Sequence, residues 1–285
     1  MSAAIVPLPQ VTARPRRVAV GSFDGVHRGH RAVIEGADTV LTFDPHPVSV
    51  ISPAAAPKLL TTLERKAQLV GELGVQELVV IHFDETFARQ TAQEFVDEVL
   101  VETLAATHVS VGENFRFGHK AVGGPDLLRA DSRFTTNEVP LLEVDGEIIS
   151  SSHIRGLVLG GAVEYAGTLL GSPFTLIGPV VDGEKRGRTL GYPTANLVPQ
   201  DAYITPAHGV YACRARTADG SWHAAATSIG VRPQFETGLG VLVEAFLIDF
   251  EGDLYGQPLE LQFLKRLRGE KRFASVEALL EQMAR

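Results

Sequence analysis

The sequence contains a single cysteine, Cys213, among its 285 residues. One cysteine excludes a disulfide within the chain and argues against a thiolate zinc site. No apolar run approaches the length of a membrane-spanning helix, and the segment Met1–Val20 has scattered prolines and arginines where a secretory signal would be continuously apolar. We therefore expect a soluble, cytoplasmic protein with no membrane partner.

Positive charge is also scarce, and the formal net charge is −8 at pH 7. Residues 1–150 hold 13 Lys and Arg against 20 Asp and Glu, and residues 151–285 hold 13 against 14. Neither part has the basic surface with which proteins bind DNA or RNA phosphates, so we expect no nucleic-acid partner. A small nucleotide remains compatible with this composition, since a phosphate site needs only a few local donors.

The chain shows two successive patterns of secondary structure. In the first, strand-like runs alternate with helical patterns, which favours a parallel sheet. The strands are expected at 17–21, 38–43, 78–83 and 107–112, with helices at 63–73 and 91–104. In the second, β-rich runs separated by turn residues favour an antiparallel barrel or sandwich. These runs are 174–181, 209–216, 222–229, 241–250 and 259–264, followed by a helix at 275–283. We place the domain boundary between residues 170 and 171.

Residues 20–30, with the sequence VGSFDGVHRGH, carry the first cluster of functional candidates. Glycines at 21, 25 and 29 let a backbone approach a ligand closely. His27 and His30 are three residues apart, so they share a face within a helical turn and suit charge stabilisation on a phosphoryl group. Two plainer interpretations stay open: a tight turn with two surface histidines, or a zinc site that lacks a convincing third ligand.

This segment resembles the HxGH signature of the nucleotidyltransferase superfamily. In its full form it resembles the FAD synthetase module of the bacterial bifunctional riboflavin kinase/FAD synthetases. Three further segments follow in the family's order. Residues 42–47 resemble its TFDPHP loop, residues 111–118 its GENFRFG motif, and residues 149–155 its ISSTxIR motif, with Ser152 where threonine is usual.

The resemblance implies transfer of AMP from ATP to FMN at this site. It implies that His27 and His30 hold the ATP phosphates and stabilise the transition state, and that Arg155 neutralises phosphate charge. The other implied nucleotide or phosphate contacts are Gly21, Phe23, Asp24, Gly25, Gly29, Asn114, Ser151 and Ser152. The implied flavin contacts are Phe43, Asp44, Pro45, His46 and Pro47. Taken singly, Arg155 is more typical of a solvated helix residue, and the serines of an ordinary helix cap.

A second cluster lies in residues 178–197, GPVVDGEKRGRTLGYPTANL. Cations interspersed with glycines are typical either of a charged hairpin or of a flap over a nucleotide. Thr194 and Asn196, two apart on an extended strand, would share one face, and their oxygens suit Mg²⁺ beside substrate phosphates.

This second segment resembles the riboflavin kinase signature GRxLGxPTAN. The resemblance implies a β-barrel kinase domain in which Thr194 and Asn196 hold Mg–ATP and Glu244 is the catalytic base for the riboflavin 5′-hydroxyl. It also implies nucleotide contacts by Gly183, Lys185, Arg188 and Gly191. The strand around Glu244 is apolar, so a partly desolvated carboxylate of raised basicity is expected there. The alternative is an ordinary outward residue of a half-buried strand.

Together these segments predict a Rossmann-like nucleotidyltransferase domain followed by a small antiparallel β-barrel riboflavin kinase domain with a C-terminal helix. The expected reactions are riboflavin to FMN and FMN to FAD, with ATP as co-substrate and Mg²⁺ as cofactor. Three alternatives stay open: a riboflavin kinase whose FAD synthetase domain is weakened, a flavin-binding regulatory or carrier protein without turnover, and cytidylyl transfer to another alcohol phosphate. Members of this family can associate, so weak self-association is also expected.

The segment between the first two motifs is short for the family. Only residues 31–41 separate His30 from Thr42. This length predicts a helix of about two turns followed by a tight connection at residues 35–38. The trimming removes no motif residue, so we expect it to affect packing more than chemistry.

Overall fold

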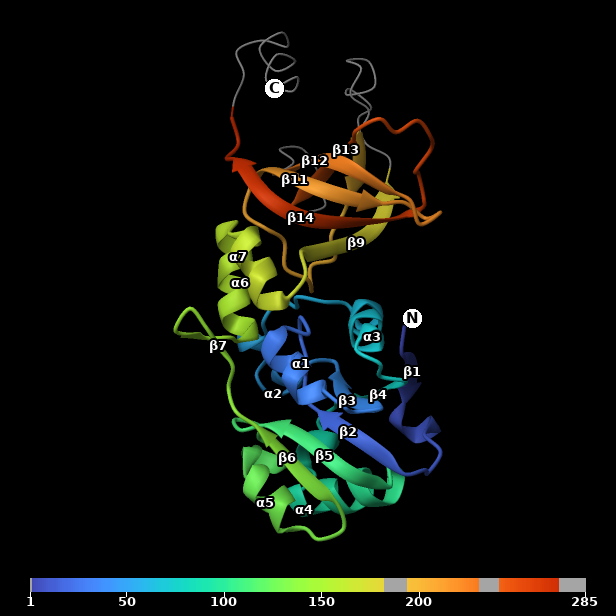
Figure 1. The fold of residues 1–285 in the computed structure, drawn as a ribbon, viewed down its shortest axis with the longest axis vertical. Helices are drawn as coiled ribbons and strands as arrows, with labels where there is room; N and C mark the ends of the chain where they lie inside the picture. The colour runs from blue at the N-terminus through green and yellow to red at the C-terminus, as the bar shows by residue number, and fades with distance from the viewer. Residues whose placement is uncertain (1, 182–193, 231–240, 272–285) are drawn as a thin grey trace. The chain divides into compact units, whose positions relative to one another are not determined.

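The structure is a computed structural model that describes residues 2–181, 194–230 and 241–271. The chain divides into two compact units, Met1–Ser151 and Ser152–Arg285, which we call the first and second units (Figure 1). The predicted helix at 275–283 and the predicted contacts Gly183, Lys185, Arg188 and Gly191 lie outside the described residues.

The first unit is built on a parallel sheet of six strands in the order β1-β4-β3-β2-β5-β6. The strands are β1 (Ala4–Pro7), β2 (Arg16–Val20), β3 (Thr39–Asp44), β4 (Glu77–His82), β5 (Ala106–Gly112) and β6 (Thr135–Val139). The chain runs outward from β2 through β3 to β4 and then returns to the other side of β2 with β5. The order therefore reverses between β2 and β5, and ligands of open α/β sheets bind at the carboxyl ends of strands beside such a reversal.

Helices connect these strands and cover the sheet (Figure 1). They are α1 (Arg28–Ile34), α2 (Pro47–Ile51), α3 (Leu63–Glu72), α4 (Ala92–Glu94), the π-helical η4 (Phe95–Thr103) and α5 (Pro125–Ala130). The 3₁₀ turns η1 (Leu8–Gln10), η2 (Pro53–Ala55), η3 (Phe87–Arg89) and η5 (His119–Ala121) and the hairpin β7 (Glu143–Val144) and β8 (Glu147–Ile148) complete the unit.

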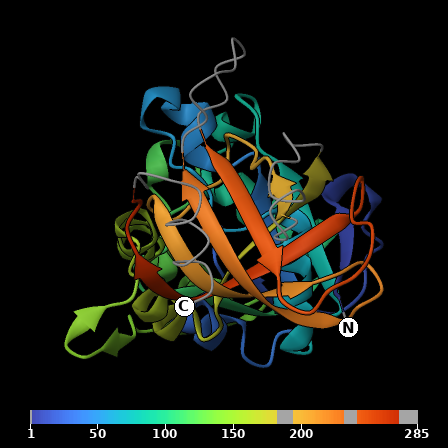
Figure 2. The same cartoon turned by 90° about the horizontal axis from the view of Figure 1, so that it is seen from above.

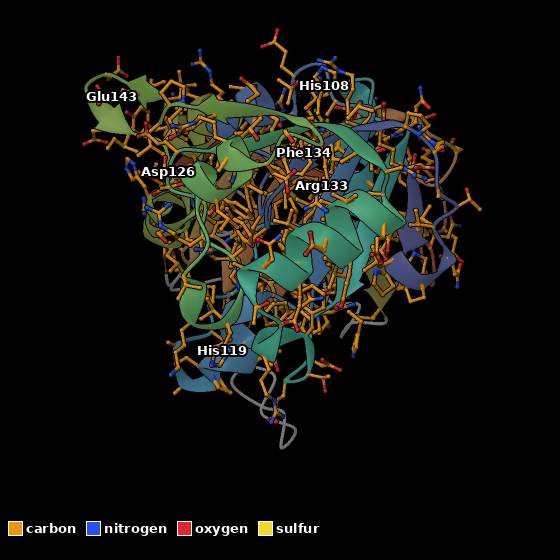
Figure 3. The ribbon with its side chains drawn as sticks, turned by 90° about the horizontal axis from the view of Figure 1, so that it is seen from below. His108, His119, Asp126, Arg133, Phe134 and Glu143 are labelled. Carbon is orange, nitrogen blue, oxygen red and sulfur yellow. The ribbon has the colours of Figure 1, made fainter. Side chains whose placement is uncertain are left out.

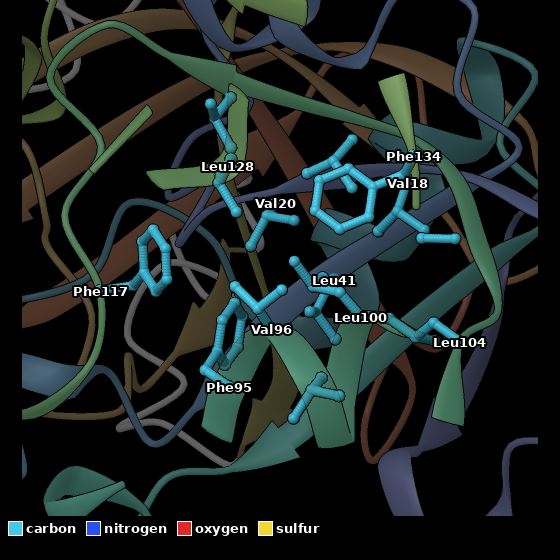
Figure 4. Close-up of a cluster of buried hydrophobic side chains, with 14 of the residues drawn as sticks. Val18, Val20, Leu41, Phe95, Val96, Leu100, Leu104, Phe117, Leu128 and Phe134 are labelled. Atoms are coloured by element: carbon cyan, nitrogen blue, oxygen red, sulfur yellow. The ribbon is translucent and has the colours of Figure 1, made fainter. Parts of the chain in front are cut away.

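Two apolar clusters hold the first unit together, one on each side of the sheet. The cluster under α4 and η4 joins Phe95, Val96 and Leu100 to Val18, Val20 and Leu41 of the strands (Figure 4). The second joins α1 and α3 to the other face through Ile34, Leu69 and Val70. Parallel strands need cover on both faces, which explains their nearly continuous apolar runs.

Several local expectations for the first unit are confirmed. The four predicted strands correspond to β2, β3, β4 and β5, and α1 has seven residues, followed by a turn at Gly36. Thr91 and Glu94 form the reciprocal capping box. The helix at 91–104 forms where expected, although from Phe95 its hydrogen bonding is that of a π-helix. The edge strands β1 and β6 were not predicted, because their short sequences lack a clear alternating pattern.

Ion pairs link η4 to the turn before β6. The Arg133 guanidinium donates to Asp131 at 2.6 Å and also pairs with Asp97, and these hydrogen bonds hold the pKa of both carboxyls below their ordinary values. Figure 3 labels Arg133 next to Phe134, whose ring is buried in the core. These pairs are exposed, so we assign them little stabilisation and attribute the anchoring of this turn to Phe134.

The second unit contains a closed antiparallel barrel in the order β10-β13-β12-β11-β14-β9 (Figure 2). Its strands are β9 (Phe174–Val181), β10 (Thr194–Leu197), β11 (Gly209–Arg216), β12 (Trp222–Gly230), β13 (Leu242–Leu247) and β14 (Pro258–Arg268). Alternate residues fill the interior, as the burial of Val243, Ala245 and Leu247 on β13 illustrates. A barrel, and not a sandwich, is therefore the architecture of this part of the chain.

Two helices precede the barrel, α6 (Ser151–Gly160) and α7 (Val163–Leu170), and α7 ends at Gly171 in the left-handed conformation. Lys265 Nζ on β14 lies 3.9 Å from Glu164 Oε1 on α7. The compact second unit therefore includes both helices, whereas the boundary predicted from the sequence lies after α7. That functional boundary stays a prediction.

Candidate functional site

The turn after β2 has a strained backbone. Phe23, Gly25 and Val26 have φ values of 47°, 88° and 42°. Only glycine adopts such values without cost, and for the β-branched Val26 the conformation is a clear outlier. Both Phe23 and Val26 are buried in the core, so packing holds the backbone in this shape. Strain of this kind concentrates at functional sites, where it presents backbone and side chains to a ligand.

The two predicted histidines are brought together at the start of α1. His27 is the N-cap residue, and its Nδ1 accepts a hydrogen bond from the His30 backbone N–H at 3.2 Å. The two rings stack with centroids 3.5 Å apart at an interplanar angle of 18°. The Phe23 ring meets His30 edge-on at 5.3 Å. The pair is therefore held at one point beside the turn, on the shared face that the spacing predicts.

Asp24, predicted as a nucleotide contact, is buried and is 3% exposed. Its carboxylate accepts backbone hydrogen bonds from Leu60 at 2.9 Å and from Thr61 at 3.2 Å. Thr61 Oγ1 in turn accepts from the Gly25 N–H at 3.1 Å. These contacts give the Asp24 carboxylate a structural function, because they fix the turn to the segment before α3.

The other predicted segments of the first unit lie at the ends of neighbouring strands. The TFDPHP segment ends β3, and Asn114 follows β5, so both belong to the same edge of the sheet as Gly21. Phe43 is half-buried and packs edge-on against Phe83, whereas Asp44 and Asn114 are exposed. His46 caps α2, its Nδ1 accepting from the Val48 N–H at 3.3 Å. The sheet thus gathers separate motifs at the edge where the strand order reverses.

Lys66 on α3 also lies at this edge, although no sequence motif identified it. Its side chain is 8% exposed, and its Nζ donates to the Ser22 carbonyl at 2.7 Å and to Thr42 Oγ1 at 3.2 Å. Burial lowers the pKa of this lysine from 10.5 to about 8. A signal was present in the sequence, because Lys66 occupies the apolar stripe formed by Leu63, Ala67 and Val70.

The serine motif divides between the two units. Ser151 Oγ, in the first unit, donates to the Asp24 carbonyl at 2.9 Å and so contacts the strained turn. Ser152 and Arg155 lie on α6 in the second unit, where Arg155 Nη1 donates to Ser152 Oγ at 3.4 Å. Arg155 is half-buried on its helix and is not the fully solvated residue of the plainer interpretation.

In the barrel, the sheet register aligns three polar residues from three strands. Asn196 on β10 is the direct partner of Glu244 on β13, and Glu244 is the partner of Ser228 on β12. Glu244 is half-buried and faces away from the interior, since its neighbours Val243 and Ala245 fill the core. The carboxylate predicted as a base therefore shares a face with the amide predicted as a metal ligand.

The predicted metal ligands are suited to a hard cation. Asn196 is 5% exposed, and within the described part of the chain its Oδ1 is buried and accepts no hydrogen bond. Thr194 lies two residues earlier on β10 and is half-buried. A buried amide oxygen without a donor is costly unless a ligand satisfies it, and Mg²⁺ takes such oxygen ligands. Among the residues that the structure describes, no cluster of three or more His, Cys, Asp or Glu could hold a metal ion.

Both parts of the chain are similar to known protein families. A family model described as FAD synthetase matches residues 10–153, and one described as riboflavin kinase matches residues 170–285. A bifunctional riboflavin kinase/FMN adenylyltransferase of Listeria monocytogenes is 39% identical over 279 residues, covering 93% of this chain and 88% of the relative. The Escherichia coli K12 protein of the same description is 35% identical and covers 94% and 89%.

A solved structure has a similar fold over nearly the whole chain. A crystal structure described as a macrolide-efflux protein from Streptococcus pneumoniae has a TM-score of 0.87 and 30% identity, covering 98% of this chain and 96% of that one. No helix within the described segments is long and apolar enough to cross a membrane.

The first unit is of the FAD synthetase class, and the barrel is of the riboflavin kinase class. The chain belongs to the family of bifunctional riboflavin kinase/FMN adenylyltransferases.

Proposed function

We propose that this protein makes FMN from riboflavin and ATP in its barrel, and FAD from FMN and a second ATP in its parallel-sheet unit, with pyrophosphate released in the second reaction. The single observation that carries the proposal is that one chain of this family holds both a stacked histidine pair at a strained strand-to-helix turn and a Glu–Asn pair across two barrel strands.

In the first unit, the FMN phosphate attacks the α-phosphorus of ATP, forming a new P–O–P link as the bond to pyrophosphate breaks. His27 and His30 stabilise negative charge on the transferring group, and no protein nucleophile is required. Their fixed stack supports this role, because preorganised donors need no rearrangement when charge develops. We assign the nucleotide side of the site to Asn114 and to residues 21, 23–25, 29 and 151. We assign the flavin side to residues 43–47.

Ser152 and Arg155 lie on α6, and the family resemblance is the ground on which we also assign them to adenylyl transfer. The Arg155 guanidinium is a planar fork that suits phosphate oxygens, and its hydrogen bond to Ser152 limits its freedom. We assign it neutralisation of the triphosphate. We also place the functional boundary after residue 170, because the kinase family match begins there and the synthetase match ends at 153.

In the barrel, Glu244 accepts the proton of the riboflavin 5′-hydroxyl as its oxygen attacks the γ-phosphorus of ATP and ADP leaves. Its half-buried position, with Asn196 as its direct partner on the neighbouring strand, supports a role as base for a substrate hydroxyl. Thr194 and Asn196 would hold Mg²⁺, and the unsatisfied Asn196 oxygen supports this assignment. The ion would neutralise phosphate charge.

We also propose that the partners are small molecules, namely ATP, riboflavin and FMN, with weak self-association at most, and that the protein works in the cytoplasm, where ATP is supplied. No described feature favours the carrier protein or the cytidylyltransferase over this assignment.

Position-specific labels on ATP test the two reactions separately. With riboflavin and Mg²⁺, a label on the γ-phosphate should enter FMN, and a label on the α-phosphate should enter FAD. Entry of γ-label into FMN with no α-label in FAD would leave a riboflavin kinase with an inactive synthetase unit. Entry of neither label into flavin would overturn both assignments.

A further inference from the structure

Lys66 is a buried cation next to residues of the proposed adenylyl-transfer site. It lies on α3 in the stripe that also buries Ala67, Leu69 and Val70 against the sheet. An apolar side chain would fill this position without the cost of removing an ammonium from water. The presence of lysine in a core position therefore calls for a contact that only a charged donor makes.

That contact is a closed triangle of hydrogen bonds. Lys66 Nζ donates to the Ser22 carbonyl at 2.7 Å and to Thr42 Oγ1 at 3.2 Å. The Thr42 hydroxyl donates to the same Ser22 carbonyl at 3.1 Å. Ser22 belongs to the strained turn that carries the histidine pair, and Thr42 begins the TFDPHP segment. One ammonium thus joins the proposed phosphate-binding turn to the proposed flavin-binding segment.

Burial and nearby carboxylates act in opposite directions on the pKa of Lys66, and burial has the larger effect. Burial lowers the pKa of Lys66 to about 8, while the carboxylates of Asp24, after β2, and Asp44, at the end of β3, act in the opposite direction. These are the charged groups of the neighbouring elements that act on it. Near neutral pH the ammonium is therefore mostly charged, and it discharges within the mildly alkaline range.

We propose that Lys66 is a positioning residue for FAD formation, whose charged side chain fixes the Gly21–His27 turn relative to the Thr42–Pro47 segment. The inference rests on the proposed function of the first unit. Lys66 acts through Ser22 and Thr42, and we assign it no contact with the reacting atoms. Misplacement of either segment separates the ATP phosphates from the attacking FMN phosphate, which lowers kcat more than it raises KM.

The removal of the charge leaves no buried donor unpaired, because Thr42 still donates to the Ser22 carbonyl. Lys66→Met should therefore fold. A loss of FAD formation in a folded Lys66→Met protein would then reflect lost positioning and not lost stability. Lys66→Arg keeps a positive charge, and Lys120→Met makes the same chemical change at an exposed lysine of the same unit. Riboflavin phosphorylation by the barrel serves as an internal control in every variant.

The experiment measures FAD formation from FMN and ATP across pH in the full chain. For the wild type, kcat should fall as the pH rises past the pKa of about 8, and riboflavin phosphorylation should show no fall of this origin. Lys66→Met should lower kcat for FAD formation about 10- to 100-fold at neutral pH and lack the alkaline fall. Lys66→Arg should recover part of the rate and also lack the fall, since arginine stays charged. Lys120→Met should behave as wild type.

An unchanged kcat for FAD formation in Lys66→Met would overturn the inference. So would an equal loss of both activities together with a lower unfolding temperature, since that pattern indicates a structural residue only. A wild-type protein that makes no FAD would instead refute the proposed synthetase function itself, so the two failures are distinguishable.

Discussion

Asn196 and Glu244 lie directly opposite each other on the antiparallel strands β10 and β13 of the barrel. They are 48 positions apart in the sequence, and the register alone brings them together on one face. We propose that this pair provides, on one patch of the barrel, a base for the riboflavin hydroxyl and a ligand for the cation that accompanies the triphosphate.

Replacement of the proposed base should slow one reaction strongly and spare the other. In Glu244→Gln the amide cannot accept the hydroxyl proton, so riboflavin phosphorylation should fall by about 100-fold or more. FAD formation from supplied FMN should stay at the wild-type rate. Glu260→Gln, at a half-buried carboxylate of β14, is the matched control and should keep both activities. Full kinase activity in Glu244→Gln would eliminate this residue as the base.

The histidine stack predicts the reciprocal pattern. His27→Ala removes both the ring and the cap that accepts from the His30 N–H, so FAD formation should fall by about 100-fold. Phosphorylation of riboflavin should continue, and FMN should accumulate. His108→Ala, at the amino end of β5, tests for a general effect of losing an imidazole and should leave FAD formation intact (Figure 3). Unaltered FAD synthesis in His27→Ala would remove the stack from the mechanism.

Lys66 should give the first unit a recognisable pH dependence of stability. Its folded pKa of about 8 lies below the ordinary 10.5, so between these values the unfolded chain binds more protons than the folded one. The folded state therefore gains stability as the pH rises through this range. The free energy of unfolding of wild type minus that of Lys66→Met should increase by about 2 kcal/mol between about pH 7.5 and pH 10. Urea titrations at a series of pH values measure it, and a constant difference would contradict the burial of a charged Lys66.

Cys213 offers a probe of the barrel. The thiol is buried in the barrel interior, and this burial raises its pKa to about 12. Alkylation of the folded protein at mildly alkaline pH should therefore be slow, and should become rapid once denaturant opens the barrel. The rate of iodoacetamide labelling as a function of urea measures this. Fast labelling of the folded protein would mean that the barrel does not close around this residue.

Much of the fold was predictable because local patterns decide it. In the parallel-sheet part, apolar strands alternate with helices, and the Thr91–Glu94 capping box marks the start of one helix. In the barrel, β9 and β11 begin and end at the predicted residues. The closed barrel was predicted only through the resemblance to riboflavin kinases, because closure depends on pairing between β9 and β10, which no local pattern shows. A hydrophobic pattern identifies which residues face inward, but does not choose between a barrel and a sandwich.

The candidate site shows the same division. The shared face of His27 and His30 follows from helical spacing, whereas the register of Asn196 with Glu244 depends on which strands become neighbours. Lys66 was missed because no motif contains it, although its place in an apolar helical stripe distinguishes it. For Asp24, the sequence did not reveal that its carboxylate binds the backbone of Leu60 and Thr61, since that contact joins segments 36 residues apart; its nucleotide contact stays a prediction.

The central claim is that one chain catalyses both steps from riboflavin to FAD. The most direct measurement is the time course of flavin products when the wild-type protein is incubated with riboflavin, ATP and Mg²⁺. We predict that FMN appears first and that FAD follows at its expense, with one ATP consumed in each step. FMN that accumulates without any FAD, or riboflavin that remains unchanged, would contradict the account.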